Sequence, residues 1–164
     1  MGQNITTTPQ DNISVIRKFW EALHHPGPAS LQTMTELMDE NIEWEVVPLN
    51  MKRRGRDEMR QLIEGAWAHW AEGGRNEITN VFASEEWICL EWTARHTIPK
   101  ESGTTTKEIQ HLNIKITLKG QKIEIRAVDV FRMKDGKIIS AREYSDYATI
   151  MRQLGVVAAA EVPK

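Results

Sequence analysis

The stretch that decides the fold is KIEIRAVDVFRMKDGKIISAREYSDY, residues 122–147. Apolar and polar side chains alternate on both sides of Lys134-Asp135-Gly136, which is the pattern of two long strands joined by a tight turn. We expect a three-residue loop between Met133 and Lys137, a type I turn followed by a glycine in the left-handed region. This loop would place Met133 opposite Lys137 and so fix the register of the hairpin.

One face of this hairpin is apolar except for two acids. Asp129 interrupts the apolar face of the first strand, and the matching face of the second strand carries Ile139, Ala141, Glu143 and Ser145. In the expected register Asp129 lies opposite Ala141, and Glu143 lies opposite Ala127. The two carboxylates are then diagonal neighbours, roughly 7 Å apart at the backbone. A shift of one residue would turn one strand's set to the other face, so the predicted site depends on this turn.

Length and composition exclude several classes of protein. The chain has 164 residues and a net charge of −2 with both signs mixed throughout, so no basic stripe indicates a nucleic-acid partner. Cys89 is the single cysteine, which excludes an internal disulfide and a cysteine-rich metal site. No apolar run reaches the length of a membrane span, and residues 1–12 lack the features of a signal peptide. We expect a cytoplasmic protein without nucleic-acid or membrane partners.

The rest of the chain divides into helices followed by strands. Helical spacing predicts helices over 13–24, 30–39 and 56–71, with Asp11 or Asn12 capping the first. Strand patterns cover 42–48, the hairpin 77–84 and 87–98, and 112–118; a short C-terminal helix follows Ser145 or Asp146 and ends at Gly155. Residues 1–10 are expected to be a loose arm, 53–55 a turn, 99–106 a loop and 156–164 a tail.

This order predicts a single α+β domain over residues 1–164. Helices that precede a run of long antiparallel strands pack on one face of the sheet. A strongly curved, mostly antiparallel sheet wrapped around them makes a cone with a pocket at its open end. His24 and His25 fall at the end of the first helix, where the negative helix terminus favours their side chains.

The predicted inner face of the sheet forms an aromatic pocket with three titratable groups, Asp129, Glu143 and His96. Such a composition is typical of a site for a hydrophobic small molecule. The side chains expected to contact that substrate are Trp44, Val46, Trp92, Ala94, Ile125, Ala127, Phe131, Ala141 and Ser145.

Burial gives the two acids complementary roles. A buried carboxylate resists ionisation, and a second carboxylate nearby adds to this effect. One acid would stay protonated while the other ionises, so the pair supplies an acid and a base for abstracting a proton beside a carbonyl group. His96 is a third candidate catalytic residue. No glycine-rich phosphate loop and no metal-ligand spacing is present in the sequence, so we expect neither cofactor nor metal.

A resemblance to a known family extends over most of the chain. Residues 128–155, VDVFRMKDGKIISAREYSDYATIMRQLG, resemble the C-terminal signature of the SnoaL-like polyketide cyclases, within the NTF2-like (cystatin-like cone) superfamily. NIEWEVVP (41–48) and RRGRDEMRQLIEG (53–65) fit the same family. The resemblance implies a homodimeric NTF2-like cone and an aldol- or enolate-type cyclase or isomerase acting on a polyketide or terpenoid.

The family's functional residues carry over only in part. The cyclases keep a histidine and an aspartate on the inner face of their last two strands, and these positions fall on Asp129 and Glu143 here. Limonene-epoxide hydrolases are more distantly similar. Their Arg-x-Asp falls on residues 92–94 and their Tyr-x-Asn on residues 44–46, where none of these residue types is present. These differences argue against epoxide hydrolysis by their mechanism.

Three readings of the site therefore stay open. The first is a cofactor-independent acid–base enzyme, the second an epoxide hydrolase with a non-standard site, and the third a non-catalytic binding or dimerisation module. In the third, Asp129 would bond Tyr144 or a backbone amide, Glu143 would pair with a lysine or arginine, and His96 would be a satisfied core histidine. An open pocket with free carboxylates favours the enzyme. The apolar outer residues Val128 and Val130 predict a homodimer interface.

Overall fold

The structure is a computed structural model that describes residues 8–69, 74–98, 106–109, 114–117 and 120–156. Its elements are α1 (Pro9–Leu23), α2 (Pro28–Leu37), β1 (Met38–Val46), the 3-10 turn η1 (Val47–Leu49), β2 (Met51–Arg54), α3 (Gly55–His69), β3 (Arg75–Ser84), β4 (Trp87–Thr97), β5 (Thr106–Ile109), β6 (Ile114–Thr117), β7 (Lys122–Lys134), β8 (Lys137–Ser145) and α4 (Tyr147–Gln153). Residues 1–7 of the predicted arm (1–10) and 157–164 of the predicted tail (156–164) lie outside the described residues, as do 70–73, 99–105, 110–113 and 118–119.

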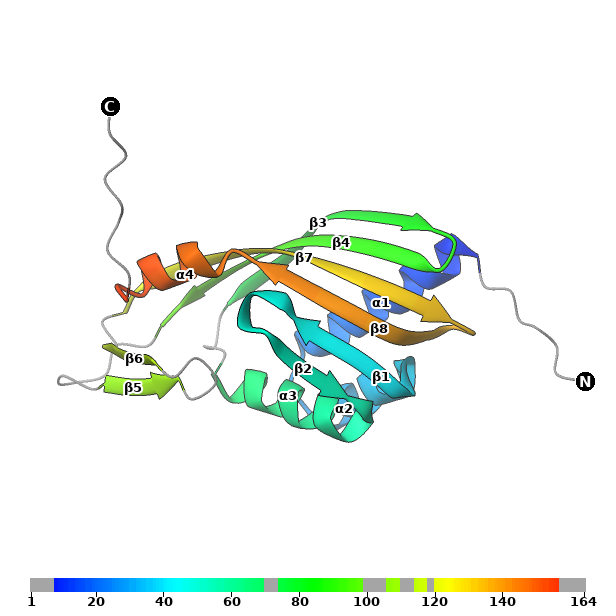
Figure 1. The fold of residues 1–164 in the computed structure, drawn as a ribbon, viewed down its shortest axis with the longest axis horizontal. Helices are drawn as coiled ribbons and strands as arrows, with labels where there is room; N and C mark the ends of the chain where they lie inside the picture. The colour runs from blue at the N-terminus through cyan, green and yellow to red at the C-terminus, as the bar shows by residue number, and fades with distance from the viewer. Residues whose placement is uncertain (1–7, 70–73, 99–105, 110–113, 118–119, 157–164) are drawn as a thin grey trace, which may run out of the picture.

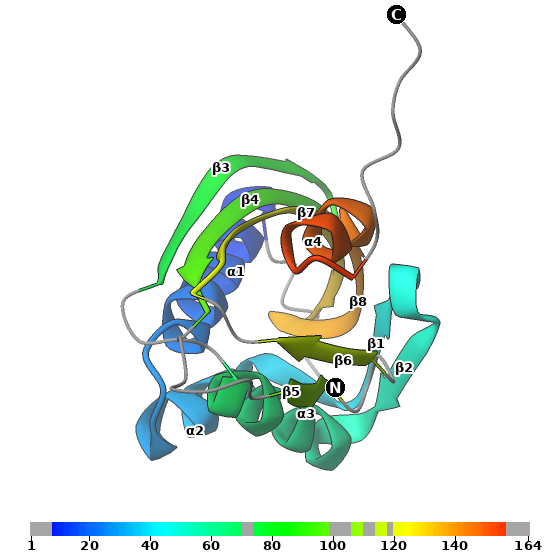
Figure 2. The same ribbon diagram turned by 90° about the vertical axis from the view of Figure 1, so that its left-hand side faces the viewer.

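Six strands form one curved sheet in the order β2-β1-β8-β7-β4-β3 (Figure 1). Every neighbouring pair is antiparallel except β1 and β8, which run parallel. The end-on view shows the sheet curving around α1, with α2 and α3 closing the open side (Figure 2). Among the described residues, no helix has the length and apolar character to cross a membrane. The predicted α+β cone is confirmed.

The first helix begins earlier than its apolar pattern indicates. Thr8, rather than Asp11 or Asn12, is the N-cap: its side chain accepts a hydrogen bond from Asp11 N, and the Asp11 carboxylate accepts one from Thr8 N, a capping box. Pro9 fits the first helical position because it needs no hydrogen-bond partner there. Asn12 is instead buried and donates to the Glu85 carbonyl at 3.1 Å, which attaches α1 to the β3–β4 turn.

Arg53 and Arg54, predicted to lie in a turn over 53–55, belong instead to the edge strand β2, and Gly55 begins α3. The chain reverses at Asn50, which lies in the left-handed region with φ 50°. Met51 then pairs with Val46, and Arg53 pairs with Trp44. The pattern was too short to identify as a strand, since only Met51 and Arg53 of the four residues face inward.

The turn between β7 and β8 is tighter than expected. Asp135 (φ 50°) and Gly136 (φ 72°) both have positive φ, which defines a two-residue type I′ turn, and Lys134 pairs with Lys137 across it. The predicted three-residue loop is therefore wrong. Asp-Gly favours this turn because glycine adopts the left-handed region without strain and aspartate tolerates it.

A bulge in β8 then restores the predicted faces. Met133 pairs with Ile138 whereas Arg132 pairs with Ser140, so Ile139 is an extra residue in β8. Ile138 is consequently the fully buried side chain at this point, not Ile139 as predicted. A two-residue turn alone would place the side chain of Glu143 on the outer face, because each one-residue shift reverses the faces of a strand.

The combined turn and bulge place the two acids directly opposite each other. Asp129 pairs with Glu143, and Ala127 pairs with Ser145. The predicted pairing of Asp129 with Ala141 is wrong, because the register of β8 against β7 is shifted by two residues. The prediction that both acids lie on the inner face of the sheet is correct. The antiparallel pairing of β7 with β8 and the positive φ of Gly136 are confirmed.

Two elements lie together at one end of the molecule. The β5–β6 hairpin, which includes part of the predicted strand 112–118, is separate from the main sheet. It lies near α4 in both views (Figures 1 and 2). Asp146 caps α4 by accepting from Thr149 N at 3.0 Å, and Gly155 follows the helix with φ 74°, as predicted. Gln153 holds α4 on β7 through two hydrogen bonds to the backbone of Glu124.

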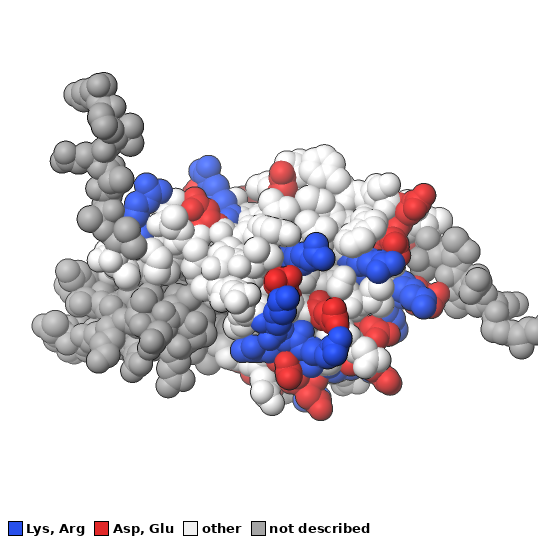
Figure 3. Space-filling view, viewed as in Figure 1, with Lys and Arg blue, Asp and Glu red and all other residues white. Residues whose placement is uncertain are grey.

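The outer face of the sheet carries an apolar patch. Phe82, Trp87 and Tyr144 are 58%, 43% and 43% exposed. The half-buried Val128 and Val130 lie between them on β7, Val128 paired with Tyr144. In Figure 3 the area over β3, β4 and β7 is mostly uncharged, whereas charged side chains gather over β1 and β2.

We expect this patch to pair with a second copy of the chain. Val130→Glu should convert a dimer to a monomer at tens of micromolar in sedimentation equilibrium, because a carboxylate would be buried at the interface. The melting temperature of the monomer should change little, since Val130 is half exposed there. Lys52→Ala, on the outer face of β2, is the control. A wild-type protein that sediments as a monomer contradicts the prediction.

Candidate active site

The concave face of the sheet and helices α1 and α3 enclose a cavity of about 450 Å³. Most of the expected site residues lie on its wall: Trp44, Val46, Trp92, Ala94, His96, Ile125, Asp129, Phe131, Glu143 and Ser145. Ala127 and Ala141 are buried on the same face but do not reach the wall. Their methyl groups are short, and each is paired with a larger aromatic neighbour, Trp92 and Phe131 respectively.

Aromatic rings form much of the wall. Trp20 of α1 packs against Trp92 with ring centroids 5.2 Å apart, and Trp44 contacts both Phe19 and Phe131 with centroids 5.9 Å apart. The helix thus contributes Phe19 and Trp20 to a site whose sheet residues alone were predicted. The apolar stripe of α1 was the available signal, but periodicity does not distinguish a core ring from a cavity ring.

Asp129 and Glu143 meet on this wall without a basic partner. Directly opposed residues have Cβ atoms roughly 5 Å apart. Trp92 Nε1 donates to Asp129 Oδ2 at 3.0 Å, and Ser145 Oγ donates to Glu143 Oε1 at 2.5 Å. Asp129 Oδ1 is buried and has no hydrogen-bond partner within the described part of the chain. Neither acid belongs to any ion pair between described residues.

Both carboxyl groups resist ionisation. Burial raises the pKa of Asp129 well above its ordinary value, the neighbouring Glu143 raises it further, and the Trp92 hydrogen bond opposes this only in part. Burial also raises the pKa of Glu143, against the Ser145 hydrogen bond. Asp129 is only 4% exposed and Glu143 is half-buried. We therefore assign the more tightly held proton to Asp129 and the first ionisation to Glu143.

Tyr147 adds a hydroxyl group that the sequence analysis missed. It is the first residue of α4, placed over the cavity by the Asp146 cap. Burial, and then the charge of Glu143, raise the pKa of Tyr147 to about 12, so its phenol stays protonated and can donate a hydrogen bond. The Ser-Asp-Tyr sequence after β8 signalled the cap but not the direction of the tyrosine.

Neutral imidazoles line another part of the cavity. Burial lowers the pKa of His96, whose Nε2 lies 3.1 Å from Asn76 Oδ1. Burial lowers the pKa of His24 to about 4, against a hydrogen bond to the Trp20 carbonyl at 2.7 Å and with smaller contributions from His25 and His96. The bond to a last-turn carbonyl fits the predicted helix-end placement of His24. Its position on the cavity wall was not predicted.

Gly74 leaves the space that the His96 ring occupies. A Cβ atom on Gly74 would lie 2.0 Å from His96 Nδ1 and 2.3 Å from Cε1. Such contacts do not occur between real atoms, so any larger residue at position 74 must displace the imidazole. The start of β3 thus positions His96 on β4.

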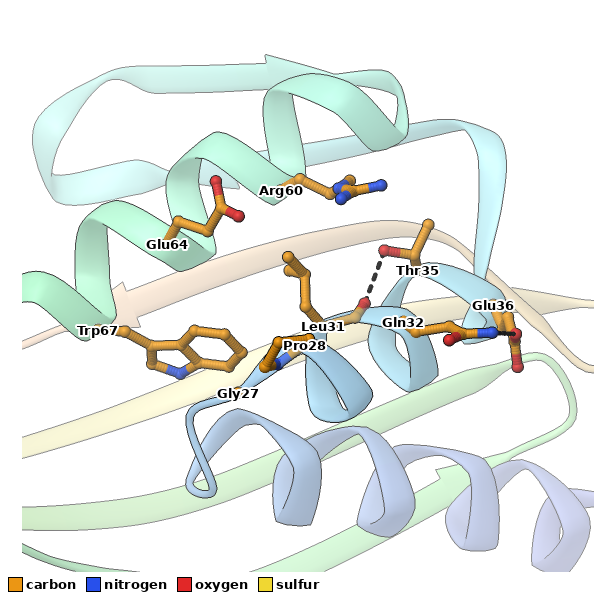
Figure 4. A pocket seen from close by; sticks show the side chains of 9 residues that line it. All are labelled: Gly27, Pro28, Leu31, Gln32, Thr35, Glu36, Arg60, Glu64 and Trp67. Atoms are coloured by element: carbon orange, nitrogen blue, oxygen red, sulfur yellow. Dashed lines mark hydrogen bonds between the residues drawn. The ribbon is translucent and has the colours of Figure 1, made fainter.

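A second hollow of about 700 Å³ lies between α2 and α3 (Figure 4). Its three charged residues, Glu36, Arg60 and Glu64, are exposed, and Thr35 Oγ1 donates a hydrogen bond to the Leu31 carbonyl at 2.7 Å. It therefore offers no buried titratable group, and the candidate site is the sheet cavity. Within the described ranges, no group of three or more histidine, cysteine or acidic residues could hold a metal ion.

The SnoaL-like domain family matches residues 16–141, and the chain belongs to this family. No match was found among curated protein sequences. A candidate SnoaL-like polyketide cyclase from Jannaschia sp. CCS1 is 12% identical, with TM-score 0.74 and coverage of 96% of this chain and 100% of that one.

Two further solved structures extend the comparison. An NTF2-like protein from Burkholderia xenovorans LB400 is 18% identical, with TM-score 0.61 over 90% and 98% of the two chains. A candidate ketosteroid isomerase from Kribbella flavida is 12% identical, with TM-score 0.59 over 95% and 84%. At these identities the likeness shows the shared NTF2-like fold, as the sequence resemblance implied.

The raised pKa of Asp129 predicts how stability depends on pH. Between its unfolded and folded pKa values the folded state holds a proton that the unfolded state has lost, so this group's contribution to stability falls as pH rises. Asp129→Asn removes that dependence. Its melting temperature should match the wild type near pH 4 and equal or exceed it at pH 8. Glu91→Gln, on the outer face of β4, is the control. If Asp129→Asn becomes progressively less stable than the wild type as the pH rises, the raised pKa of Asp129 is contradicted.

Gly74→Ala should destabilise the protein by about 1–3 kcal/mol, because the added methyl overlaps the His96 ring. Gly74→Ala combined with His96→Ala should recover part of this loss, since the smaller side chain makes room. Gly65→Ala on α3, where a Cβ meets nothing within 4 Å, is the matched control. Chemical denaturation compares the wild type, Gly74→Ala, His96→Ala, the double variant and the control. If the losses of the two single variants simply add in the double variant, Gly74 does not position His96.

Proposed function

We propose that the cavity is the active site of a cofactor-independent enzyme that forms an enolate from a hydrophobic oxygenated molecule, as a cyclase or isomerase does. The observation that carries this proposal is the pair Asp129 and Glu143, opposed on adjacent strands, buried in an aromatic cavity and free of basic partners. Two groups of the same type with unequal exposure can hold different protonation states at one pH. The names of two structural relatives, a cyclase and an isomerase, support the same reaction class.

The chemical step uses Glu143 as base and both Asp129 and Tyr147 as hydrogen-bond donors. Glu143 takes a proton from the carbon beside a substrate carbonyl, and the electrons of the broken C–H bond move to the carbonyl oxygen. The protonated Asp129 and the phenol of Tyr147 stabilise the negative charge that develops there. In a cyclase the enolate carbon then attacks a second carbonyl, whose oxygen takes the proton from Glu143. In an isomerase Glu143 returns that proton to another carbon of the enolate system. Such positioned acid–base groups contribute roughly 10²–10⁴-fold in rate.

If the protein is a non-catalytic binding module, structural partners must neutralise the two acids. Tyr144, the partner expected for Asp129, is exposed on the outer face of the sheet. No described arginine or lysine pairs with Asp129 or Glu143. An unpaired buried acid costs folding free energy, so a purely structural reason to keep both is not evident in these contacts.

The test is exchange of α-protons for deuterium in hydrophobic ketones, 2-tetralone and a 3-ketosteroid, followed by NMR. Asp129→Asn and Glu143→Gln should each lower the rate by at least about a hundredfold while the fold is kept, because each change is near-isosteric. His96→Phe should lower the rate less if the imidazole only orients the substrate. Glu91→Gln, an acid on the outer face of the same sheet, should not change it.

The pH profile of the exchange rate gives an independent check. One base and one acid should produce a bell-shaped profile. A flat rate between about pH 5 and 9 would remove the carboxylate pair from the mechanism. A large fall in melting temperature on replacing either acid, with exchange unaffected by the change, would identify the pair as structural and the protein as a binding module.

A further inference from the structure

We infer that Arg53 gives the cavity a carboxylate-binding end, so that the ligand is an amphiphilic molecule with an apolar body and an acidic group. The inference rests on the proposed function only where it places a carbonyl group of the ligand beside Asp129 and Glu143. The binding of a carboxylate by Arg53 does not depend on that function. Arg53 is the only lysine or arginine on the cavity wall among the described residues. It belongs to β2, which the sequence analysis did not identify as a strand.

The three basic residues of β2 have opposite environments. Lys52 and Arg54 point outward and pair with Glu45 and Glu43 of the neighbouring strand β1. Arg53 lies between them on the inner face, opposite the buried Trp44. Because strand side chains alternate, β2 directs one guanidinium into the cavity and two cations to solvent.

Within the described structure, the guanidinium of Arg53 has no acidic partner. None of the ion pairs between described residues includes it, and within the same residues its side chain donates one hydrogen bond, from Nη1 to the Lys52 carbonyl at 2.8 Å. The N–H groups of Nε and Nη2, on the other edge of the guanidinium, therefore remain able to donate hydrogen bonds to a ligand. This planar edge matches the two oxygens of a carboxylate, which it binds through two parallel hydrogen bonds.

Arg53 lies far enough from the acids to bind a second group of the same ligand. Val46 connects the two regions of the sheet, since it pairs with Glu143 on one side and with Met51 on the other. Arg53 is two residues beyond Met51 on β2. Two strand spacings and two residues correspond to roughly 12 Å between the Cα atoms of Arg53 and Glu143.

The neighbours of Arg53 place it at the solvent side of the cavity. Arg53 is half-buried, and Gln61 of α3, which lines the same cavity, is exposed. Trp44 and Asp129 on the same wall are buried, with 8% and 4% exposure. A ligand with its carboxylate at Arg53 would place its apolar body among the rings and an uncharged carbonyl region beside Asp129 and Glu143. The repulsion between the acids and a second carboxylate favours this orientation over the reverse.

The test compares carboxylates with their neutral amides by quenching of tryptophan fluorescence. The pairs are 2-naphthoate with 2-naphthamide, and 1-pyrenebutyrate with 1-pyrenebutyramide. Wild-type protein should bind at least one carboxylate about tenfold more tightly than its amide, the lower range for a hydrogen-bonded ion pair near solvent. Arg53→Gln should abolish the preference and Arg53→Lys should keep part of it. Arg54→Gln, its outward neighbour, should leave the preference intact.

A lack of carboxylate preference in both pairs, or a preference that survives Arg53→Gln, overturns the inference. The Asp129→Asn variant separates this result from the proposed function. It should keep the carboxylate preference, because Asp129 lies at the other end of the cavity. If the acids prove dispensable for proton exchange but the preference depends on Arg53, the carboxylate end stands and the enzyme proposal fails.

Discussion

The site depends on one interaction, the direct opposition of the Asp129 and Glu143 carboxyl groups across β7 and β8. Two negative charges at this distance in an apolar wall repel strongly, and burial opposes each charge separately. A proton held by one of them relieves the repulsion, and burial, which raises the pKa of Asp129, favours Asp129 as its site. The remaining features of the site follow from this constraint: Trp92 donates to Asp129, Ser145 donates to Glu143, and Tyr147 stays protonated near the resulting charge.

The backbone that creates this opposition combines two departures from regular geometry. The Asp135-Gly136 turn joins the strands in a register that would separate the acids, and the extra residue Ile139 corrects it. Bulges are frequent beside functional sites because they redirect side chains without changing the rest of the sheet. Here the bulge lies four residues before Glu143, close enough to direct its side chain and far enough to leave the Asp129–Glu143 pairing regular.

The sequence predicted the class of fold and the inner face of the sheet because both follow from alternation of apolar side chains. Asp129 and Glu143 were visible as interruptions of that alternation, and His96 likewise. The sequence did not predict the cavity residues that come from other elements of the fold, because their positions depend on how those elements pack on the sheet. Trp20 and His24 reach the cavity from α1, Tyr147 from α4 and Arg53 from a strand of four residues. The turn type was misjudged because a three-residue loop and a two-residue turn plus bulge give the same faces from Ser140 to Ser145. The two differ in the pairing partner of Asp129 and in which of Ile138 and Ile139 is fully buried.

The most direct test of the central claim is an infrared titration of the carboxyl groups, with Asp129→Asn and Glu143→Gln difference spectra to assign the bands. The account predicts that near neutral pH the wild-type protein shows one protonated buried carboxyl band, that Asp129→Asn removes it, and that Glu143 is ionised there. Two ionised carboxylates near neutral pH, with no protonated band lost in the Asp129→Asn spectrum, would contradict the account.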